Sequence, residues 1–349
     1  DIALALYVTL GIYSLLRWLD GGEHRQLVYL AICLGGSLAI KLTTIFVIAA
    51  IVLIALLRLR QVQNSARMLG SLCLSLVLAG VLASPWYLRT WQATGSPLFP
   101  FYLSIWKGAA PGWDVERSNL FQAMNAQYGG VDRAPVNYLL APLRLSLAAQ
   151  PEDADLYDGV LGAAFLIGLP LIWFGLRRKN STVATLTGIS GIYFLFWLFS
   201  SEQIRYLLPI VPLLAVAVAA SADSSEEKGA EKAWYYALAF ACLLGIGTSL
   251  AWFAMRSPMR VVLGGETRDE YLARMIDHYP YYQVVNSETP QNAAIWLIDM
   301  RRDTYNIERR AVSDYLFEDH TLKEILWRSQ NIDDLRRNAA ALKVDYILA

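Results

Sequence analysis

The chain has 349 residues, of which 56% are hydrophobic and only 17% are charged, and its mean hydropathy is +0.36. These values exclude an ordinary soluble domain and predict a polytopic α-helical membrane protein. The net charge is zero, so no basic surface indicates nucleic acid as a partner. Cys33, Cys73 and Cys242 lie inside apolar segments and the three histidines share no ligand spacing, so we expect neither a disulfide framework nor a zinc site.

Eight apolar segments follow one another, and most approach the roughly 20 residues that a membrane-spanning helix needs. They cover residues 2–19, 27–40, 43–58, 69–86, 156–176, 183–200, 204–221 and 234–255. A single helix made of the second and third segments would exceed the hydrocarbon core of about 30 Å by half, and Lys41 between them favours a break. Asp1 opens the first segment with neither Met nor a basic leader, so we expect the chain to be an N-terminally truncated fragment.

Basic residues gather in the short connections at residues 17–25, 58–67 and 177–179. Cytoplasmic loops of membrane proteins carry an excess of Lys and Arg. About eight spans place all three connections on the cytoplasmic side, whereas seven would separate the first from the second. Lys41 and the residues after 255 then face the outer, extracytoplasmic side of the membrane.

Residues 84–102 are rich in aromatic side chains that favour the boundary between hydrocarbon and water, among them Trp86, Tyr87 and Trp91. We expect Pro85 to end the preceding helix and the chain to run along the membrane surface from there. Arg89 places a cation at this level, where it suits a lipid phosphate. The alternative is an ordinary aromatic belt with one Arg that reaches for the headgroups.

The outer loop that follows, residues 87–155, is too long for a simple connection. Apolar residues at helical spacing predict short interfacial helices over residues 119–127 and 134–148. Four acidic residues precede or open the next apolar segment. They are Glu152, Asp153, Asp155 and Asp158, and a solvated acidic turn is favoured over an acid–base or metal role.

The chain divides into a membrane domain, residues 1–255, and a small soluble α/β domain, residues 256–349. In the second domain a capping box begins a helix at Thr267 and another helix begins at Asn331. Residues 293–298 and 344–348 are expected strands, with a helix near residues 322–328 between them. The domain has no glycine-rich phosphate loop, so nucleotide binding is not expected.

Several short motifs, in this order and on a common side of the membrane, resemble the membrane-embedded GT-C glycosyltransferases, in particular bacterial members similar to the protein mannosyltransferases and the lipid A aminoarabinose transferase. The motifs cover residues 1–6, 36–44, 84–89, 95–100, 158–162, 201–209 and 281–290. The resemblance implies transfer of a sugar from a polyprenyl phosphate to a lipid, glycan or protein acceptor. It also implies a bacterial inner membrane protein whose C-terminal domain is extracytoplasmic.

The resemblance also implies roles for individual residues. Lys41, Arg89 and Arg205 with its neighbour Tyr206 would hold the donor phosphate, and Asp1 would support the site. The alternatives are a Lys41 side chain that reaches water from a helix end and an Arg205–Tyr206 pair that anchors a helix end. The principal catalytic carboxylate of the family lies in a first outer loop that this chain lacks. No cofactor is certain, and a divalent metal stays open because some members of the superfamily use one.

Two other classes of function compete with the glycosyltransferase. A transporter or flippase for a lipid-linked sugar would need the same cations without a catalytic base, but it predicts inverted repeats, and we find no internal repeat. A non-catalytic membrane receptor would bind a ligand or partner through the outer α/β domain.

Overall fold

The computed structural model describes residues 1–59, 65–108, 110, 113–130, 134–221, 229–300, 304–314, 317 and 319–349. These residues form two compact units, Asp1–Ile246 and Gly247–Ala349. The division falls inside one long helix, α11 (Gly229–Arg256), nine residues before the boundary that the sequence predicts.

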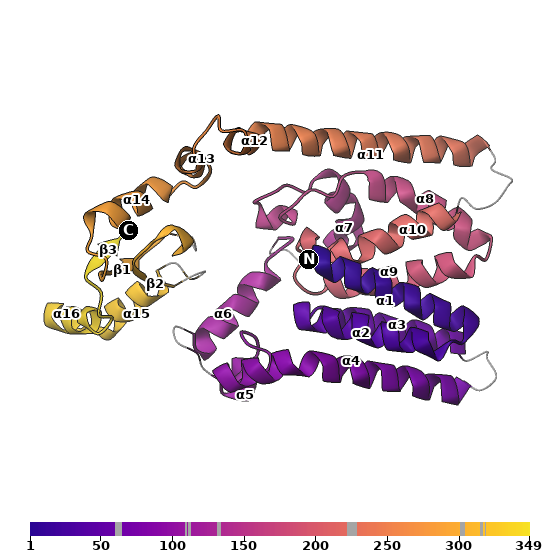
Figure 1. Ribbon diagram of the computed structural model, residues 1–349, viewed down its shortest axis with the longest axis horizontal. Helices are drawn as coiled ribbons and strands as arrows, with labels where there is room; N and C mark the ends of the chain where they lie inside the picture. Colours follow the sequence, from indigo (N-terminus) through magenta and orange to yellow (C-terminus); the bar gives the residue numbers. More distant parts are fainter. Residues whose placement is uncertain are drawn as a thin grey trace. The chain divides into compact units, whose positions relative to one another are not determined.

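The first unit is built almost entirely of helices (Figure 1). Its long helices are α1 (Ile2–Gly21), α2 (His24–Ile40), α3 (Thr44–Leu59), α4 (Ser65–Thr94), α8 (Ala164–Arg177), α9 (Ser181–Leu198), α10 (Val211–Ser221) and the first part of α11. A 3-10 helix, η2 (Ile204–Ile210), leads directly into α10. Each of the eight expected apolar segments therefore contains a helix.

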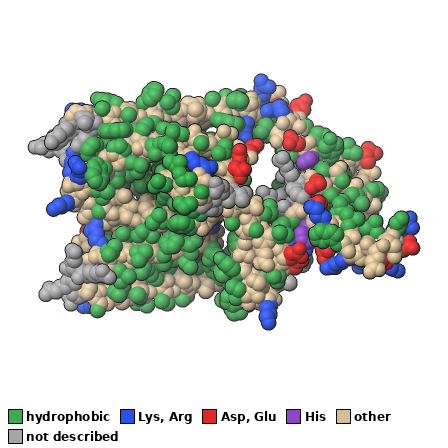
Figure 2. Space-filling model, turned by 180° about the vertical axis from the view of Figure 1, so that it is seen from behind, with side chains coloured by type: hydrophobic (Ala, Val, Ile, Leu, Met, Phe, Trp, Pro, Cys, Tyr) green, Lys and Arg blue, Asp and Glu red, His purple; other side chains and the backbone are tan. Residues whose placement is uncertain are grey.

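Five helical stretches of the described residues are long and apolar enough to cross a membrane. They are Ile2–Gly21, Ser65–Thr94, Ser181–Leu198, Ile204–Ser221 and Lys232–Arg256, and three shorter apolar helices accompany them. Figure 2 shows hydrophobic side chains spread over the outer surface of the first unit. An exterior of this kind suits lipid rather than water and is compatible with a helical membrane protein.

Small residues allow α2 and α4 to pack closely. Ser75, Ala79 and Ala83 recur at intervals of four on α4 and are all buried. The Ser75 hydroxyl donates to the Leu27 carbonyl over 2.7 Å, and Gly35 of α2 lies against Ala79. Small residues at this spacing are typical of helix contacts inside membranes, because they let two backbones approach.

The expectation that Pro85 ends a helix is wrong, because α4 continues through Pro85 to Thr94. Proline has no N–H, so one carbonyl in the preceding turn loses its helical donor. The Ser84 hydroxyl donates to the Val81 carbonyl over 2.8 Å and supplies a replacement. The turn comes instead at Gly95, whose φ of +73° suits glycine.

The described residues of the outer loop include the short helices α5 (Leu103–Trp106), α6 (Val115–Ala126) and α7 (Pro135–Leu147), and the last two confirm helices near the two expected positions. The Asp114 carboxylate accepts from the Arg117 N–H and begins α6 four residues earlier than expected. A single 3-10 turn, η1 (Ala154–Leu156), follows.

The apolar segment expected at residue 156 becomes an α-helix only at Ala164, where α8 begins. Tyr157, Asp158 and Gly162 have positive φ values, which are incompatible with a regular helix. The hydrophobicity of this stretch therefore belongs partly to a buried turn, in which the side chain of Tyr157 is fully buried.

The second unit contains the end of α11 and a small α/β arrangement. Its helices are α12 (Met259–Val262), α13 (Arg268–Met275), α14 (Tyr279–Glu288), α15 (His320–Arg328) and α16 (Ile332–Ala340), with a 3-10 turn η3 (Thr304–Asn306). Three parallel strands, β1 (Ala294–Leu297), β2 (Arg310–Ser313) and β3 (Tyr346–Leu348), form a sheet in the order β2-β1-β3.

The two expected strands of this unit are confirmed, as are the helix between them and both helix starts. Thr267 and Glu270 make the predicted capping box, and the Asn331 side chain accepts from the Asp334 N–H. The edge strand β2 was not expected. It has only four residues and pairs with β1 from Ala294 with Arg310 to Leu297 with Ser313, so its identity depends on a tertiary contact.

Candidate functional site

The break between α2 and α3 places the charge of Lys41 beside two other elements of the first unit, the start of α1 and the 3-10 helix η2. Its backbone leaves the helix with a φ of −157°, while its N–H still donates to the Ser37 carbonyl over 2.9 Å. The side chain therefore projects away from the axis of α2. An ammonium group at the end of an apolar helix needs partners or water, and here it has partners.

The Lys41 ammonium contacts a carboxylate and an aromatic ring. Its Nζ atom lies 2.6 Å from Asp1 Oδ1 at the start of α1. The same Nζ lies 3.7 Å from the centroid of the Tyr206 ring in η2. The side chains of Lys41 and Asp1 are 25% and 21% exposed, so the pair is mostly shielded yet open on one side. Both attractions favour the charged lysine.

Arg205 brings a second cation to the same ring. Its Cζ atom lies 5.3 Å from the Tyr206 centroid, and its Nε–H donates to Gln203 Oε1 over 2.7 Å. Among the described residues no hydrogen bond engages the Nη atoms of Arg205. The guanidinium is thus oriented through Nε, and no hydrogen bond within the described part of the chain occupies its outer edge. We call Asp1, Lys41, Arg205 and Tyr206 the cation cluster.

A buried loop fixes the position of η2. Gln203 is 2% exposed, and its carbonyl accepts from the Trp197 indole N–H over 2.8 Å. The Tyr193 hydroxyl donates to the Tyr206 carbonyl over 2.8 Å, and the Ile204 N–H donates to the Tyr157 carbonyl over 3.0 Å. Side chains of α9 and the turn before α8 therefore hold the backbone that carries Arg205.

Electrostatics within the cluster act on Lys41 in opposite directions. Burial and the positive charge of Arg205 lower the pKa of Lys41 to about 8. The Asp1 carboxylate counteracts this by stabilising the ammonium. A phosphate bound between the two cations would stabilise the charged lysine further, because its negative charge offsets their repulsion.

Glu202 and Gln203 lie in the motif at residues 201–209, but neither of them was named from the sequence as a site residue. Glu202 is 4% exposed, and Gly129 lies so close that an added Cβ would be 2.1 Å from Glu202 Oε2. Gly129 also has a φ of +86°, which favours glycine at this point. Two signals were present in the sequence, a carboxylate next to an apolar segment and the pair Gly129–Gly130. Their association is visible only in three dimensions.

The structure does not bring Arg89 into the cation cluster. Arg89 is exposed on α4, and the described residues provide it with no hydrogen bond, ion pair or ring contact. Tyr87, two positions earlier, donates from its hydroxyl to the Leu38 carbonyl over 2.8 Å. Two residues correspond to about 200° around a helix, so Arg89 projects from the face opposite the contact with α2.

The two tryptophans of the expected interface, Trp86 and Trp91, are exposed on α4. Trp91 makes an edge contact with Trp106 of α5, with ring centroids 5.7 Å apart. These positions are compatible with side chains that lie at a membrane boundary.

The acidic residues before α8 form a turn in which carboxylate side chains accept hydrogen bonds from backbone N–H groups of the same turn. Asp153 Oδ1 accepts from the N–H groups of Asp155 and Leu156, and Asp158 Oδ1 accepts from the Glu152 N–H. Within the described part of the chain, no group of three or more His, Cys, Asp or Glu side chains could hold a metal ion.

Comparison with known proteins gives one match. No curated protein and no solved structure matches the chain. A family model described as a domain of unknown function, DUF8201, matches residues 1–212. This stretch includes all four residues of the cation cluster and ends inside α10. Since the match covers more than half of the sequence, the chain belongs to the DUF8201 family.

Proposed function

We propose that the protein is a membrane glycosyltransferase of the GT-C type, which takes a sugar from a polyprenyl phosphate and transfers it to an acceptor at the outer membrane face. The observation that carries the proposal is the cation cluster. Lys41 and Arg205 come from separate elements and both lie against the ring of Tyr206, and Asp1 pairs with Lys41. The choice of a sugar donor rests on the motif resemblance described above.

The chemistry explains why two cations would be useful. In a direct displacement the acceptor oxygen attacks the anomeric carbon, and the bond from that carbon to the phosphate oxygen breaks with its electron pair. The acceptor proton passes to a base. The phosphodiester of the donor becomes a phosphomonoester, so the negative charge on the phosphate increases by one. Fixed cations favour that increase over the ground state and so accelerate the step. The direct displacement itself inverts the anomeric centre.

The proposal includes a membrane placement. Eight spans in the bacterial inner membrane would put the basic connections in the cytoplasm and the Lys41 break at the outer face. The same count places the residues after α11 outside the cytoplasm. The acceptor is a lipid, glycan or protein reached from that side, and nucleic acid is not among the proposed partners.

Release of undecaprenyl phosphate from a panel of undecaprenyl-phosphate-linked sugars tests the activity in membranes containing the full-length protein. We expect release with at least one donor, and a large loss of rate in Lys41→Ala and Arg205→Ala. Arg89→Ala is the matched control, because it removes an exposed cation outside the cluster and should keep the rate. Release that is equal in all four proteins, or absent from all of them, would overturn the proposed function.

A further inference from the structure

The segment that follows α11 exposes apolar side chains at the tip of an ordered loop. Residues 257–265 contain α12, and we call them the α12 loop. Val262 and Leu263 are 73% and 78% exposed, and Met259 is also exposed. The loop begins only one residue after Lys232–Arg256, a helical stretch long and apolar enough to cross a membrane.

Backbone hydrogen bonds close the α12 loop on itself. The Leu263 N–H donates to the Met259 carbonyl over 2.9 Å, and the Gly265 N–H donates to the Arg260 carbonyl over 2.7 Å. Gly264 has a φ of +76°, which allows the tight reversal after α12. The exposed apolar tip therefore has a defined conformation.

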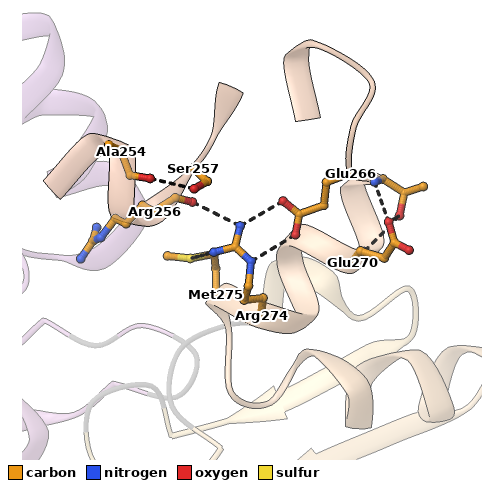
Figure 3. A network of polar contacts seen from close by, with 8 residues as sticks. Ala254, Arg256, Ser257, Glu266, Glu270, Arg274 and Met275 are labelled. Carbon is orange, nitrogen blue, oxygen red and sulfur yellow. Dashed lines mark hydrogen bonds and ion pairs between the residues drawn. The ribbon is translucent and has the colours of Figure 1, made fainter. Parts of the chain in front are cut away.

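A polar clamp joins the two ends of the loop (Figure 3). The Arg274 guanidinium donates to the Arg256 carbonyl at the end of α11 over 3.2 Å. It also donates to both carboxylate oxygens of Glu266, over 3.1 Å from Nε and 3.0 Å from Nη2. Arg274 lowers the pKa of Glu266, so this carboxylate stays ionised at neutral pH. The clamp holds the base of the loop on α13 and leaves the tip outward.

Cations flank the apolar tip. Arg256 lies over the Trp252 ring, with its Cζ atom 5.6 Å from the centroid, and Arg260 is exposed on α12. Apolar side chains bordered by Lys or Arg, next to a spanning helix, are typical of segments that enter the headgroup region of an anionic bilayer.

We propose that the α12 loop is a membrane-inserting loop whose occupant is the bilayer crossed by α11. Met259, Val262 and Leu263 enter the interface to a depth of about 5–10 Å, and Arg256 and Arg260 contact lipid phosphates. The inference rests on α11 crossing the membrane and is independent of the proposed glycosyl transfer. The role of the α12 loop is to fix the direction in which the chain leaves the bilayer toward α13.

Fluorescence quenching in lipid nanodiscs tests the loop directly. The full chain, with Cys33, Cys73 and Cys242 replaced by Ala, receives a single Leu263→Cys substitution labelled with an environment-sensitive fluorophore. The matched control is Tyr305→Cys, because Tyr305 is 91% exposed in the same unit but lies on η3. The nanodiscs contain phosphatidylglycerol and phosphatidylcholine, with a spin label on the lipid headgroup or in aqueous solution.

The proposal expects the probe at position 263 to be blue-shifted and quenched by the lipid label, with most of its accessibility to the aqueous quencher lost. The probe at position 305 should show the opposite behaviour. A probe at 263 that the aqueous label quenches as strongly as the probe at 305 would overturn the proposal. Equal quenching of both probes by the lipid label would overturn it too, because lipid proximity would then not belong to the loop.

Discussion

Lys41 shows how a single charge at a helix end acquires a specific environment. The side chain faces a carboxylate, a second cation and an aromatic ring, all within the first unit. An ammonium that only reached for water from a short helix would not require these partners. The proposed phosphate binding depends on these contacts, and the protonation state of Lys41 is the variable that a pH experiment can change.

Affinity for undecaprenyl phosphate should fall by about tenfold between about pH 7 and about pH 9. The pKa of Lys41 is lowered to about 8, so the ammonium is present below that pH and is lost above it. The phosphate, with its second pKa near 6, is already about nine-tenths ionised at pH 7 and gains only slightly more charge above it, so its titration cannot cause a fall in affinity. Lipid binding measured at a series of pH values checks the prediction.

Lys41→Arg is the control for this experiment, because a guanidinium keeps its charge throughout the range. Its binding should vary little with pH. A fall of the same size in Lys41→Arg would assign the pH dependence to another group.

At the scale of elements, the packing of α2 on α4 depends on Gly35. A Cβ added at Gly35 would lie 2.8 Å from Leu82 Cβ and 3.0 Å from the Ala79 carbonyl oxygen. These atoms belong to the backbone or lie next to it, so they cannot move aside as the end of a flexible side chain could. The contact also positions the end of α2, from which Lys41 emerges.

We expect Gly35→Ala to destabilise the protein by about 1–3 kcal/mol, because it forces two packed helices apart. The matched control is Gly80→Ala on α4, where an added Cβ meets no atom within 4 Å. Thermal unfolding in detergent, followed by loss of monodisperse protein, provides the comparison. A Gly35→Ala protein as stable as the Gly80→Ala protein would show that this contact does not hold the helices together.

The sequence predicted the elements better than their ends. Runs of apolar residues near membrane length identified all eight helical segments, and Lys41 identified a break that the structure contains. The continuation of α4 through Pro85 is accompanied by a hydrogen bond from the Ser84 hydroxyl to the Val81 carbonyl, and no pattern of hydrophobicity reveals that bond. Strand β2 was not predicted from the sequence, because four residues at a sheet edge form a strand only when β1 is beside them.

The candidate site was predictable only in part, for a related reason. The motifs supplied Asp1, Lys41, Arg205 and Tyr206 as residues on one side of the membrane, but their contacts depend on how the start of α1, the end of α2 and η2 pack. The separate position of Arg89 follows from its angle on a helix that was expected to end at Pro85. The end of α4 and the position of Arg89 relative to the other cations therefore depend on the same element.

At the scale of the whole molecule, the positions of the basic connections predict which side of the membrane each part of the chain faces. Residues 17–25 and 177–179 would face the cytoplasm, and the second unit would face outward. The number of membrane spans decides this orientation, because one span more or fewer moves every later connection to the opposite side of the membrane.

A cysteine-accessibility experiment in intact cells can check the sides. In the chain without its native cysteines, Tyr305→Cys should react with a membrane-impermeant maleimide, whereas Asp20→Cys should react only after the cells are permeabilised. Both positions are exposed, so a difference reports the membrane and not burial. Labelling of Asp20→Cys alone in intact cells would reverse the proposed orientation, and labelling of both would contradict the span count.

The central claim is that Lys41 and Arg205 together bind the phosphate of a polyprenyl lipid. Native mass spectrometry of the full-length protein with undecaprenyl phosphate, in mild detergent, tests it most directly. The account predicts a bound lipid in the parent and in Arg89→Ala, and loss of that lipid in Lys41→Ala and in Arg205→Ala. Equal binding in all four proteins, or loss only in Arg89→Ala, would contradict it.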